Sequence, residues 1–309
     1  MPQKPAVITI SGPTCIGKTE VAIALAEPLA GEIISADAMQ VYRYMDIGTA
    51  KPSKEQMARV PHHLIDVVDP DEPFSAASFR TMAASIIGDL HEKGKTVFVV
   101  GGTGLYIKAL TQGLFQAPAG DSGIRNRLKA DLKTLGLEAM YGRLKGVDPE
   151  GAAKIHPKDS YRVIRALEVF QVTGRPISEH HRTHEFSDEP YRVLKIGLSM
   201  DREILYHRIN ERVEQMLSQG FVDEVKGLLD RGYGPDLKSM QSIGYRHVSY
   251  FLLGRLDWDE TVRLFKRDTR RYAKRQFTWL KADADIQWRQ PEEVEFIGKE
   301  IDAFLTKAL

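Results

Sequence analysis

Short apolar runs alternate with amphipathic stretches through the first third of the chain. The runs AVITIS, EIISAD, HLIDVV and TVFVVGG cover residues 6–11, 32–37, 63–68 and 96–102. Apolar residues at helical spacing follow Lys18 and recur from about Ser75 to Glu92. Strands that read as continuous apolar runs, as VFVV does, are typical of parallel sheets with helices on both faces. The pattern therefore predicts an α/β fold built from βαβ units, with a mostly parallel sheet flanked by helices.

A helical insertion is predicted before the next strand. That strand is VLKIGLSM at residues 193–200, and the polar, helix-favouring segment 119–190 precedes it. The segment is entered through APAGDSG and left through EFSDEP, which are loop-forming sequences. We therefore expect one core domain made of residues 1–118 and 191–309, interrupted by an insertion domain at 119–190. After Met200 the chain is predicted to be mostly helical.

Composition limits the class of protein. The chain has 309 residues, of which 42% are hydrophobic, and a formal net charge of +1. This charge gives no global sign of a nucleic-acid partner, so only local clusters of basic residues can indicate one. The single cysteine, Cys15, excludes an internal disulfide framework. No apolar run approaches the roughly 20 residues of a membrane span, and the start has no cleavable signal pattern. We expect a cytoplasmic protein that does not enter a membrane.

The segment GPTCIGKT after the first strand matches the phosphate-binding pattern G-x-x-x-x-G-K-[ST]. Gly12 and Gly17 permit backbone angles that turn N–H groups inward at the start of a helix, and Lys18 adds a positive charge. The Thr19 hydroxyl is placed to bind Mg²⁺ that bridges phosphate oxygens. The predicted phosphate-binding loop comprises Gly12, Pro13, Thr14, Cys15, Ile16, Gly17, Lys18 and Thr19.

The chain lacks the strand-end carboxylate that P-loop NTPases use to hold the metal or to position water. The run TVFVVGG ends in glycine, and Thr103 stands where an acid is expected. The best placed acid is Asp37, at the end of EIISAD. Ligands of parallel sheets bind beyond the carboxyl ends of the strands. We therefore expect Asp37, Thr103 and the phosphate-binding loop to meet at one crevice.

Five motifs resemble those of the bacterial tRNA dimethylallyltransferases, also called tRNA isopentenyltransferases. They are SADAMQVYRYMDIGTAKP, GGTGLYIKAL, DSYRVIRALEVFQVTGRPIS, QSIGYRHV and RRYAKRQFTWLK, and the resemblance covers nearly the whole chain. It implies a P-loop NTPase-like core and transfer of the dimethylallyl group from dimethylallyl diphosphate to the adenine on the 3′ side of the anticodon, in tRNAs that read codons beginning with U. Ala38 replaces the family's usual serine, whereas Asp37, Met39 and Gln40 are retained.

The resemblance also implies a role for each candidate residue at the reacting groups. The phosphate-binding loop would hold the diphosphate leaving group together with Mg²⁺, which explains why no strand acid is needed. Asp37 would accept a proton from the attacking amine, and Thr103 would orient the reacting groups. Among the arginines of the helix near Arg208, we expect Arg212 to contact the diphosphate.

The partner implied by the resemblance is a tRNA anticodon stem-loop, whose adenine must be extruded from its stack to reach the crevice. The residues expected to contact it are Asp37, Ala38, Met39, Gln40 and Thr103, then Arg125, Tyr161, Arg162, Val163, Ile164 and Arg165 of the insertion, and finally Ser242, Ile243, Gly244, Tyr245, Arg246, His247, Arg275, Gln276, Phe277, Thr278, Trp279, Leu280, Lys281 and Ala282.

A basic stretch near the C-terminus favours a nucleic-acid partner independently of the resemblance. Between Arg263 and Lys281 the only acid is Asp268, and the basic residues are Arg263, Lys266, Arg267, Arg270, Arg271, Lys274, Arg275 and Lys281. Helical spacing places Arg263, Arg267, Arg270, Arg271 and Lys274 on one broad face, which suits a phosphate backbone. The alternative is a solvated basic helix that packs through its apolar residues.

Two rival functions are compatible with a P-loop. A small-molecule or nucleotide kinase would use the insertion as a lid, but it does not explain the missing strand acid or the basic stretch. A noncatalytic RNA-binding regulator would use the loop as a nucleotide switch, but it does not explain Asp37 and Thr103. Nothing in the sequence requires an oligomer, and we expect a monomer.

Overall fold

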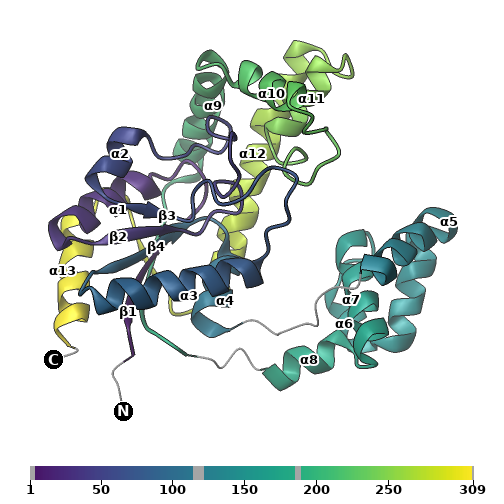
Figure 1. Cartoon of the computed structure of the whole chain (residues 1–309), viewed down its shortest axis with the longest axis horizontal. Helices are drawn as coiled ribbons and strands as arrows, with labels where there is room; N and C mark the ends of the chain where they lie inside the picture. The colour runs from purple at the N-terminus through teal and green to yellow at the C-terminus, as the bar shows by residue number, and fades with distance from the viewer. Residues whose placement is uncertain (1–3, 114–121, 185–188, 308–309) are drawn as a thin grey trace. The chain divides into compact units, whose positions relative to one another are not determined.

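The computed structural model describes residues 4–113, 122–184 and 189–307. The chain forms two compact units, one made of Met1–Thr111 with Glu189–Leu309 and the other of Gln112–Asp188. The first is an α/β unit and the second is helical (Figure 1). Most of the expected insertion, residues 119–190, falls in the second unit. Among the described helices, none is both long and apolar enough to span a membrane.

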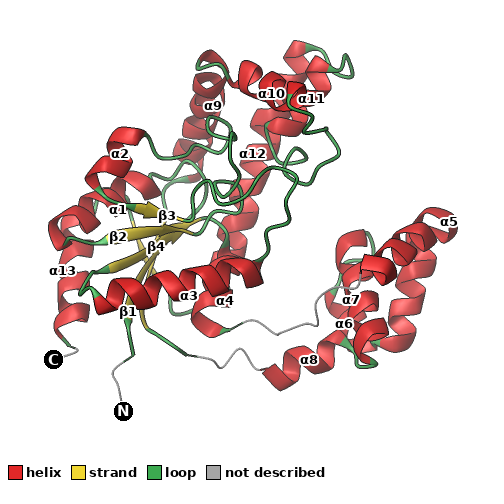
Figure 2. Ribbon diagram, viewed as in Figure 1, coloured by secondary structure: helices red, strands yellow, loops and turns green. Residues whose placement is uncertain are grey.

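The α/β unit is organised around a six-stranded sheet in which every pairing is parallel (Figure 2). The strand order is β3-β2-β4-β1-β5-β6. The strands are β1 (Ala6–Ser11), β2 (Glu32–Ser35), β3 (His62–His63), β4 (Val97–Gly101), β5 (Arg192–Leu198) and β6 (Gln287–Arg289). The predicted α/β fold with a parallel sheet is therefore confirmed.

Helices pack against both faces of the sheet because neighbouring residues of a strand point to opposite faces. Val7 and Val99 belong to a core cluster with residues of α3 (Ala76–Glu92) and α4 (Gly104–Gln112). Ile8 and Phe98 belong to another cluster with residues of α1 (Lys18–Ala26) and α13 (Val294–Thr306). The remaining elements of this unit are η1 (Glu27–Leu29), α2 (Lys54–Arg59), α9 (Arg202–Ser218), α10 (Phe221–Asp230), α11 (Tyr245–Leu252) and α12 (Trp258–Leu280).

At the edges of the sheet, one strand prediction was wrong and one strand was missed. In HLIDVV only the first residue, His63, lies in a strand, and Val68 forms an isolated bridge with Tyr42. Leu64 and Asp66 have φ of 61° and 55°, so the backbone leaves the extended conformation there. The edge strand β6 was not predicted, because its short, polar sequence has no apolar run.

The helical unit has its own core. Its helices are α5 (Ser122–Val147), α6 (Pro149–Lys154), α7 (Ser160–Thr173) and α8 (Ile177–His184). The non-helical backbone of Gly136 divides α5 into two segments. Leu128, Leu144, Val163 and Leu167 are buried together between α5 and α7. The unit therefore has a hydrophobic core of its own, as expected for a separate domain.

Candidate active site

Lys18 forms hydrogen bonds with backbone carbonyls of the loop between β1 and α1. Gly17, in the left-handed conformation at φ 100°, turns the chain into α1. Gly12 has little room for a side chain, because a Cβ there would lie 3.1 Å from the Leu198 carbonyl oxygen. The Lys18 ammonium donates hydrogen bonds to the carbonyls of Gly12 at 3.1 Å and Pro13 at 2.8 Å. A loop that leads into a helix N-terminus in this way is suited to bind an anion.

Burial shifts the pKa of two side chains in this loop. It lowers the pKa of the Lys18 ammonium below its ordinary value of 10.5, and the nearby Asp37 carboxylate opposes that shift. Burial also raises the pKa of the Cys15 thiol, so the thiol stays neutral. A bound anion would stabilise the charged form of the Lys18 ammonium.

Gln276 of α12 connects the phosphate-binding loop to the loop after β4. Its side-chain oxygen accepts a hydrogen bond from the Thr14 N–H at 2.9 Å, and its amide nitrogen donates to the Gly102 carbonyl at 2.9 Å. A Cβ on Gly102 would lie 2.2 Å from that nitrogen, so any larger residue there would displace the Gln276 amide. Gln276 is 7% exposed. In this structure the side chain is therefore buried and holds two loops together, and its tRNA contact stays a prediction.

Asp37 and Thr103 lie at the ends of neighbouring strands β2 and β4. One Asp37 carboxylate oxygen accepts hydrogen bonds from the N–H groups of Met39 at 2.8 Å and Gln40 at 3.4 Å. The Thr103 hydroxyl accepts one from the Ala38 N–H at 3.0 Å. Thr103 thus holds the turn that presents Asp37, and it is absent from the walls of both cavities described next.

Two cavities meet at Asp37. The phosphate-loop cavity, of about 690 Å³, includes Lys18 and Thr19 in its wall. The basic cavity, of about 610 Å³, lies between the Asp37 turn and α9, α11 and α12. The arginines that line the basic cavity are Arg212, Arg246, Arg271 and Arg275. The residues that line both cavities are Thr14, Cys15, Asp37, Thr49, Arg212 and Met216.

Arg212 reaches this junction from α9. Its guanidinium donates a long hydrogen bond of 3.4 Å to the side chain of Gln215. Within residues 4–113, 122–184 and 189–307, no carboxylate forms an ion pair with Arg212. Arg208, one helical turn earlier, lies 3.8 Å from Glu292. Arg212 is therefore the better placed of the two arginines to bind an anion.

Asp268 organises the cations of the basic cavity. Its carboxylate lies within 3.2 Å of Arg246 and His247, 2.8 Å of Arg267 and 3.8 Å of Arg271. Burial alone would raise the pKa of Asp268, but hydrogen bonds from Arg267 and His247 lower it overall. The carboxylate therefore stays ionised and fixes the positions of the surrounding cations.

The other basic residues of α12 do not form the single broad face that helical spacing predicted. Arg263 pairs with Glu260 on the same helix. Arg270 donates a 2.6 Å hydrogen bond to Asn210, and Lys266 contacts Glu214 at 2.5 Å. Asn210 and Glu214 belong to α9, so part of the basic stretch joins two helices instead of facing outward.

The residues expected to contact tRNA differ in burial. In the α/β unit, Tyr245, His247 and Leu280 are buried, whereas Trp279 is 40% exposed. In the helical unit, the side chains of Val163 and Ile164 are buried, whereas Tyr161 is 69% exposed. Arg125 and Arg165 both bind Glu168, at 2.9 Å and 2.8 Å. The side chains of the buried members are shielded from solvent in this structure, and the set as a whole stays a prediction. Those with exposed side chains are Tyr161, Arg162, Arg275, Thr278, Trp279, Lys281 and Ala282.

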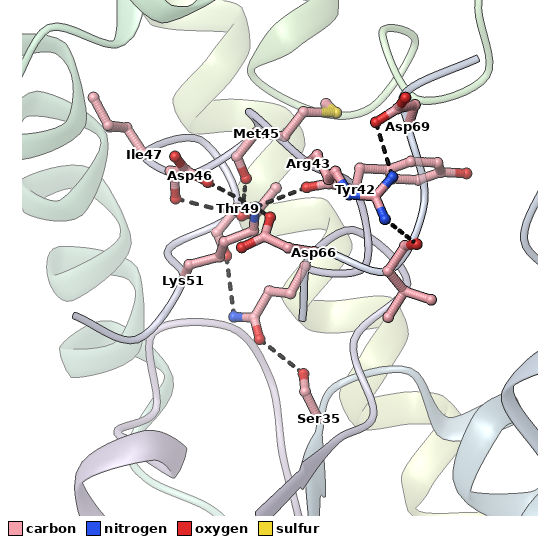
Figure 3. Close-up of polar contacts among 12 residues, drawn as sticks. Ser35, Tyr42, Arg43, Met45, Asp46, Ile47, Thr49, Lys51, Asp66 and Asp69 are labelled. Atoms are coloured by element: carbon pink, nitrogen blue, oxygen red, sulfur yellow. Dashed lines mark hydrogen bonds and ion pairs between the residues drawn. The ribbon is translucent and has the colours of Figure 1, made fainter. Parts of the chain in front are cut away.

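The loop after Asp37 contains polar contacts that no motif indicated (Figure 3). Lys51 is buried and donates to the Tyr42 carbonyl at 2.7 Å and to the carboxylates of Asp46 and Asp66 at 2.6 Å and 2.5 Å. The Gln40 amide nitrogen donates to the carbonyls of Thr49 at 3.3 Å and Ala50 at 3.2 Å. The Gln40 oxygen accepts from the Ser35 hydroxyl at 2.8 Å. These contacts fix the segment between Gln40 and Lys51, in which Thr49 lines both cavities.

The chain is similar to known proteins over nearly its full length. A family model described as IPP transferase matches residues 40–283. A tRNA dimethylallyltransferase of Geobacter metallireducens is 51% identical and covers 99% of this chain and 97% of its own. A tRNA dimethylallyltransferase 2 of Geotalea uraniireducens is 55% identical, covering 96% of each chain.

Solved structures agree with these relatives. A tRNA isopentenylpyrophosphate transferase from Bacillus halodurans has a TM-score of 0.74 and 42% identity, covering 99% of this chain and 98% of its own. A eukaryotic dimethylallyltransferase acting on tRNA has a TM-score of 0.79 and 30% identity, covering 93% of this chain and 74% of its own. The motifs, the fold and these matches lead to one conclusion: the chain belongs to the IPP transferase family, that of the tRNA dimethylallyltransferases.

Proposed function

We infer that this enzyme transfers the dimethylallyl group of dimethylallyl diphosphate to the exocyclic amine of the adenine on the 3′ side of the anticodon, in tRNAs that read codons beginning with U. Diphosphate is the second product. The observation that best supports this assignment is the position of Asp37, in the wall shared by the phosphate-loop cavity and the basic cavity. A carboxylate at that junction can act between a phosphate-bearing donor and a nucleic-acid acceptor.

The phosphate-loop cavity suits the donor diphosphate. The N-terminus of α1 and the Lys18 ammonium would stabilise the negative charge that develops on the leaving group. Arg212 lines the cavity from the opposite element, α9, and would contact the same group. This arrangement stabilises a departing anion and requires no activated water.

Mg²⁺ is compatible with the residues of this cavity. The Thr19 hydroxyl lies in its wall, next to Lys18 in sequence. Across the described ranges, no group of three or more His, Cys, Asp or Glu side chains is arranged to hold a metal. Mg²⁺ retains several waters and is often bound with substrate phosphates, so one hydroxyl with diphosphate oxygens is a suitable set. When bound there, Mg²⁺ would neutralise charge on the diphosphate.

The basic cavity suits the acceptor. Extrusion of a stacked base costs a few kcal/mol, and contacts with its edges and with neighbouring phosphates repay that cost. Arg246 and Arg271 are held by Asp268, and Arg275 lies above the Tyr272 ring at 5.8 Å from its centroid. These cations would bind phosphates around the extruded adenine.

The chemical step requires one bond to form and one to break. The adenine nitrogen attacks the allylic carbon, and the carbon–oxygen bond breaks with its electron pair leaving on the diphosphate. The proton released by the amine passes to a carboxylate oxygen of Asp37. Thr103 supports this step by holding the Ala38 N–H and hence the turn that presents Asp37.

A kinase is the weaker assignment. β4 ends at Gly101 and is followed by Gly102 and Thr103, so this strand offers no acid for the metal of phosphoryl transfer. The acids that line the phosphate-loop cavity besides Asp37 are Glu20, Glu211 and Glu292, and none of them follows a strand of the sheet centre.

One assay separates these functions. The protein is incubated with an anticodon stem-loop and Mg²⁺, with either dimethylallyl diphosphate or ATP, and the products are analysed by mass spectrometry. We expect a stem-loop heavier by one five-carbon unit only with dimethylallyl diphosphate. Replacing the adenine by guanine should abolish the product. Phosphorylation of any added component from ATP, without prenylated RNA, would refute the proposal.

A further inference from the structure

The carboxylate of Glu224 fills a nest of three consecutive backbone N–H groups. One of its oxygens accepts hydrogen bonds from Asp46 at 3.0 Å and Ile47 at 2.7 Å, and the other accepts from Gly48 at 3.2 Å. Successive N–H groups that converge in this way form an anion-binding site. Here the anion belongs to the protein itself, in the first turn of α10.

The nest is pressed against two aromatic rings. A Cβ on Gly48 would lie 2.3 Å from the Phe221 ring and 2.5 Å from the Tyr245 ring, so the backbone approaches them as only glycine can. The Tyr245 hydroxyl donates a 2.6 Å hydrogen bond to Glu224, and Tyr245 is 1% exposed. The loop is therefore joined to α10 and α11 by charge, hydrogen bonds and packing.

Hydrogen bonds lead from this nest to the Asp37 turn. The residues that follow it, Thr49 and Ala50, offer their carbonyls to the Gln40 amide at 3.3 Å and 3.2 Å. The Gln40 N–H in turn donates to the Asp37 carboxylate at 3.4 Å. Thr49 lines both cavities beside Asp37. Displacing residues 46–48 from Glu224 would therefore make the positions of Thr49 and Asp37 in the cavity walls less fixed.

The phosphate-binding loop is held by different residues. Lys18 binds the carbonyls of Gly12 and Pro13, and Gln276 binds Thr14. None of these bonds involves Glu224 or the nest. Loss of the Glu224 contacts should therefore disturb the acceptor side and Asp37 more than the diphosphate-binding side.

We propose that Glu224 is a positioning residue for the transfer reaction, which fixes the loop 46–50 onto α10 and α11 and thereby sets the position of Asp37 toward the acceptor. The proposal rests on the function proposed above. It assigns to Tyr245, which is 1% exposed and donates a hydrogen bond to Glu224, the role of holding that carboxylate in place. Misplacement of a reacting group by about 1 Å can cost roughly 100-fold in rate, so this support matters for catalysis.

Three variants test the proposal. Glu224→Gln keeps the size of the side chain but replaces one acceptor oxygen by a group that can only donate. Tyr245→Phe removes one hydrogen bond and retains the packing. Asp223→Asn is the matched control, because Asp223 is exposed, precedes Glu224 in the same helical turn and makes no side-chain hydrogen bond or ion pair within the described part of the chain.

The measurements are kcat with a saturating stem-loop, the Kd of dimethylallyl diphosphate, the midpoint of thermal unfolding, and amide hydrogen exchange of residues 46–48. We expect Glu224→Gln to lower kcat roughly 10- to 100-fold, and Tyr245→Phe to lower it about fivefold. Donor Kd should change less than about twofold, because the phosphate-binding loop has its own supports. Exchange at 46–48 should accelerate in both variants and stay unchanged in Asp223→Asn.

Two results would overturn the inference while the wild type still prenylates RNA. One is a kcat in both variants equal to that of Asp223→Asn. The other is a parallel loss of kcat, donor affinity and thermal stability, which would indicate a purely structural role. If Glu224→Gln does not fold, Tyr245→Phe serves as the same test. A wild-type protein that makes no prenylated RNA would instead refute the proposed function.

Discussion

The Thr14 N–H and the Gln276 side-chain oxygen lie 2.9 Å apart although 262 positions separate them in the chain. Gln276 also binds the Gly102 carbonyl, so one buried amide sets the spacing between the phosphate-binding loop and the loop that contains Thr103. An amide is suited to this position because it both accepts and donates.

Gln276→Glu should destabilise the protein without a change in side-chain shape. The carboxylate can still accept from Thr14, but its second oxygen would face the Gly102 carbonyl. Opposing two buried acceptors costs about 1–3 kcal/mol, measurable as the free energy of unfolding in denaturant. Gln287→Glu, at an exposed position of β6, is the control and should change it little. Equal effects of the two substitutions would contradict the role of Gln276.

Asp37→Asn should abolish transfer while donor binding persists. Asparagine can still accept the hydrogen bond from Met39, so the turn is retained and only the base is lost. We expect kcat to fall about 10²- to 10⁴-fold, with an unchanged Kd for dimethylallyl diphosphate measured by calorimetry. Glu20→Gln removes a different carboxylate from the phosphate-loop cavity and should leave kcat nearly unaltered. Wild-type turnover in Asp37→Asn would exclude Asp37 from the chemistry.

Lys18→Gln should weaken donor binding by about 1.5–3 kcal/mol, the usual contribution of a hydrogen bond to a charged group. Lys54→Gln, at an exposed position of α2, should have no such effect. An unchanged donor affinity in Lys18→Gln would rule out the proposed contact between Lys18 and the diphosphate.

The pH dependence of donor binding follows from the same lysine. Burial lowers the pKa of Lys18 in the folded protein below 10.5. The charged form binds the diphosphate, so donor affinity should be complete below the folded pKa and should decline as pH rises through it. In Lys18→Gln this alkaline decline should be absent. Protein stability should show the opposite trend. Between the lowered pKa of Lys18 in the folded protein and its ordinary pKa in the unfolded chain, the unfolded chain binds more protons. The free energy of unfolding should therefore increase as pH rises through this range, because the cost of burying the Lys18 charge is lost.

Arg271→Gln combined with Arg275→Gln should weaken stem-loop binding and reduce its dependence on salt. Each lost phosphate contact lowers the slope of log K against log salt by about one. Arg263→Gln is the control on the same helix, because Arg263 pairs with Glu260 and does not line the basic cavity. Fluorescence anisotropy at several salt concentrations measures the slope. An unaltered slope in the double variant would place the RNA on another surface.

The central strands were predictable because their signals are local. AVITIS, VFVV and the run from Val193 are mostly apolar, as expected for strands buried on both faces. The order of glycines and Lys18 in GPTCIGKT requires a phosphate-binding loop at a helix N-terminus. Parallel strands end on the same side of the sheet, so the positions of Asp37 and Thr103 at one edge of the sheet followed from the element order, although Thr103 does not line the cavities.

The edges of the sheet and the walls of the cavities were not predictable in this way. HLIDVV reads as a strand, yet Leu64 and Asp66 adopt left-handed backbone angles to allow the loop that Lys51 holds. The basic stretch of α12 reads as one surface, yet Arg270 and Lys266 turn toward α9. A sequence pattern states which residues share a face of a helix, but not what that face packs against.

Local chemistry in the sequence was therefore sufficient to determine the fold class and the family, and to predict the phosphate-binding loop. Only the tertiary structure decided which polar side chains hold the loops of the site in place. Gln276 binds two loops, and Glu224 binds the N–H groups of residues 46–48. These bonds join residues that are far apart in the chain, and each uses a backbone N–H or carbonyl group. Because backbone N–H and carbonyl groups leave no mark in the sequence, only the tertiary structure could reveal these contacts.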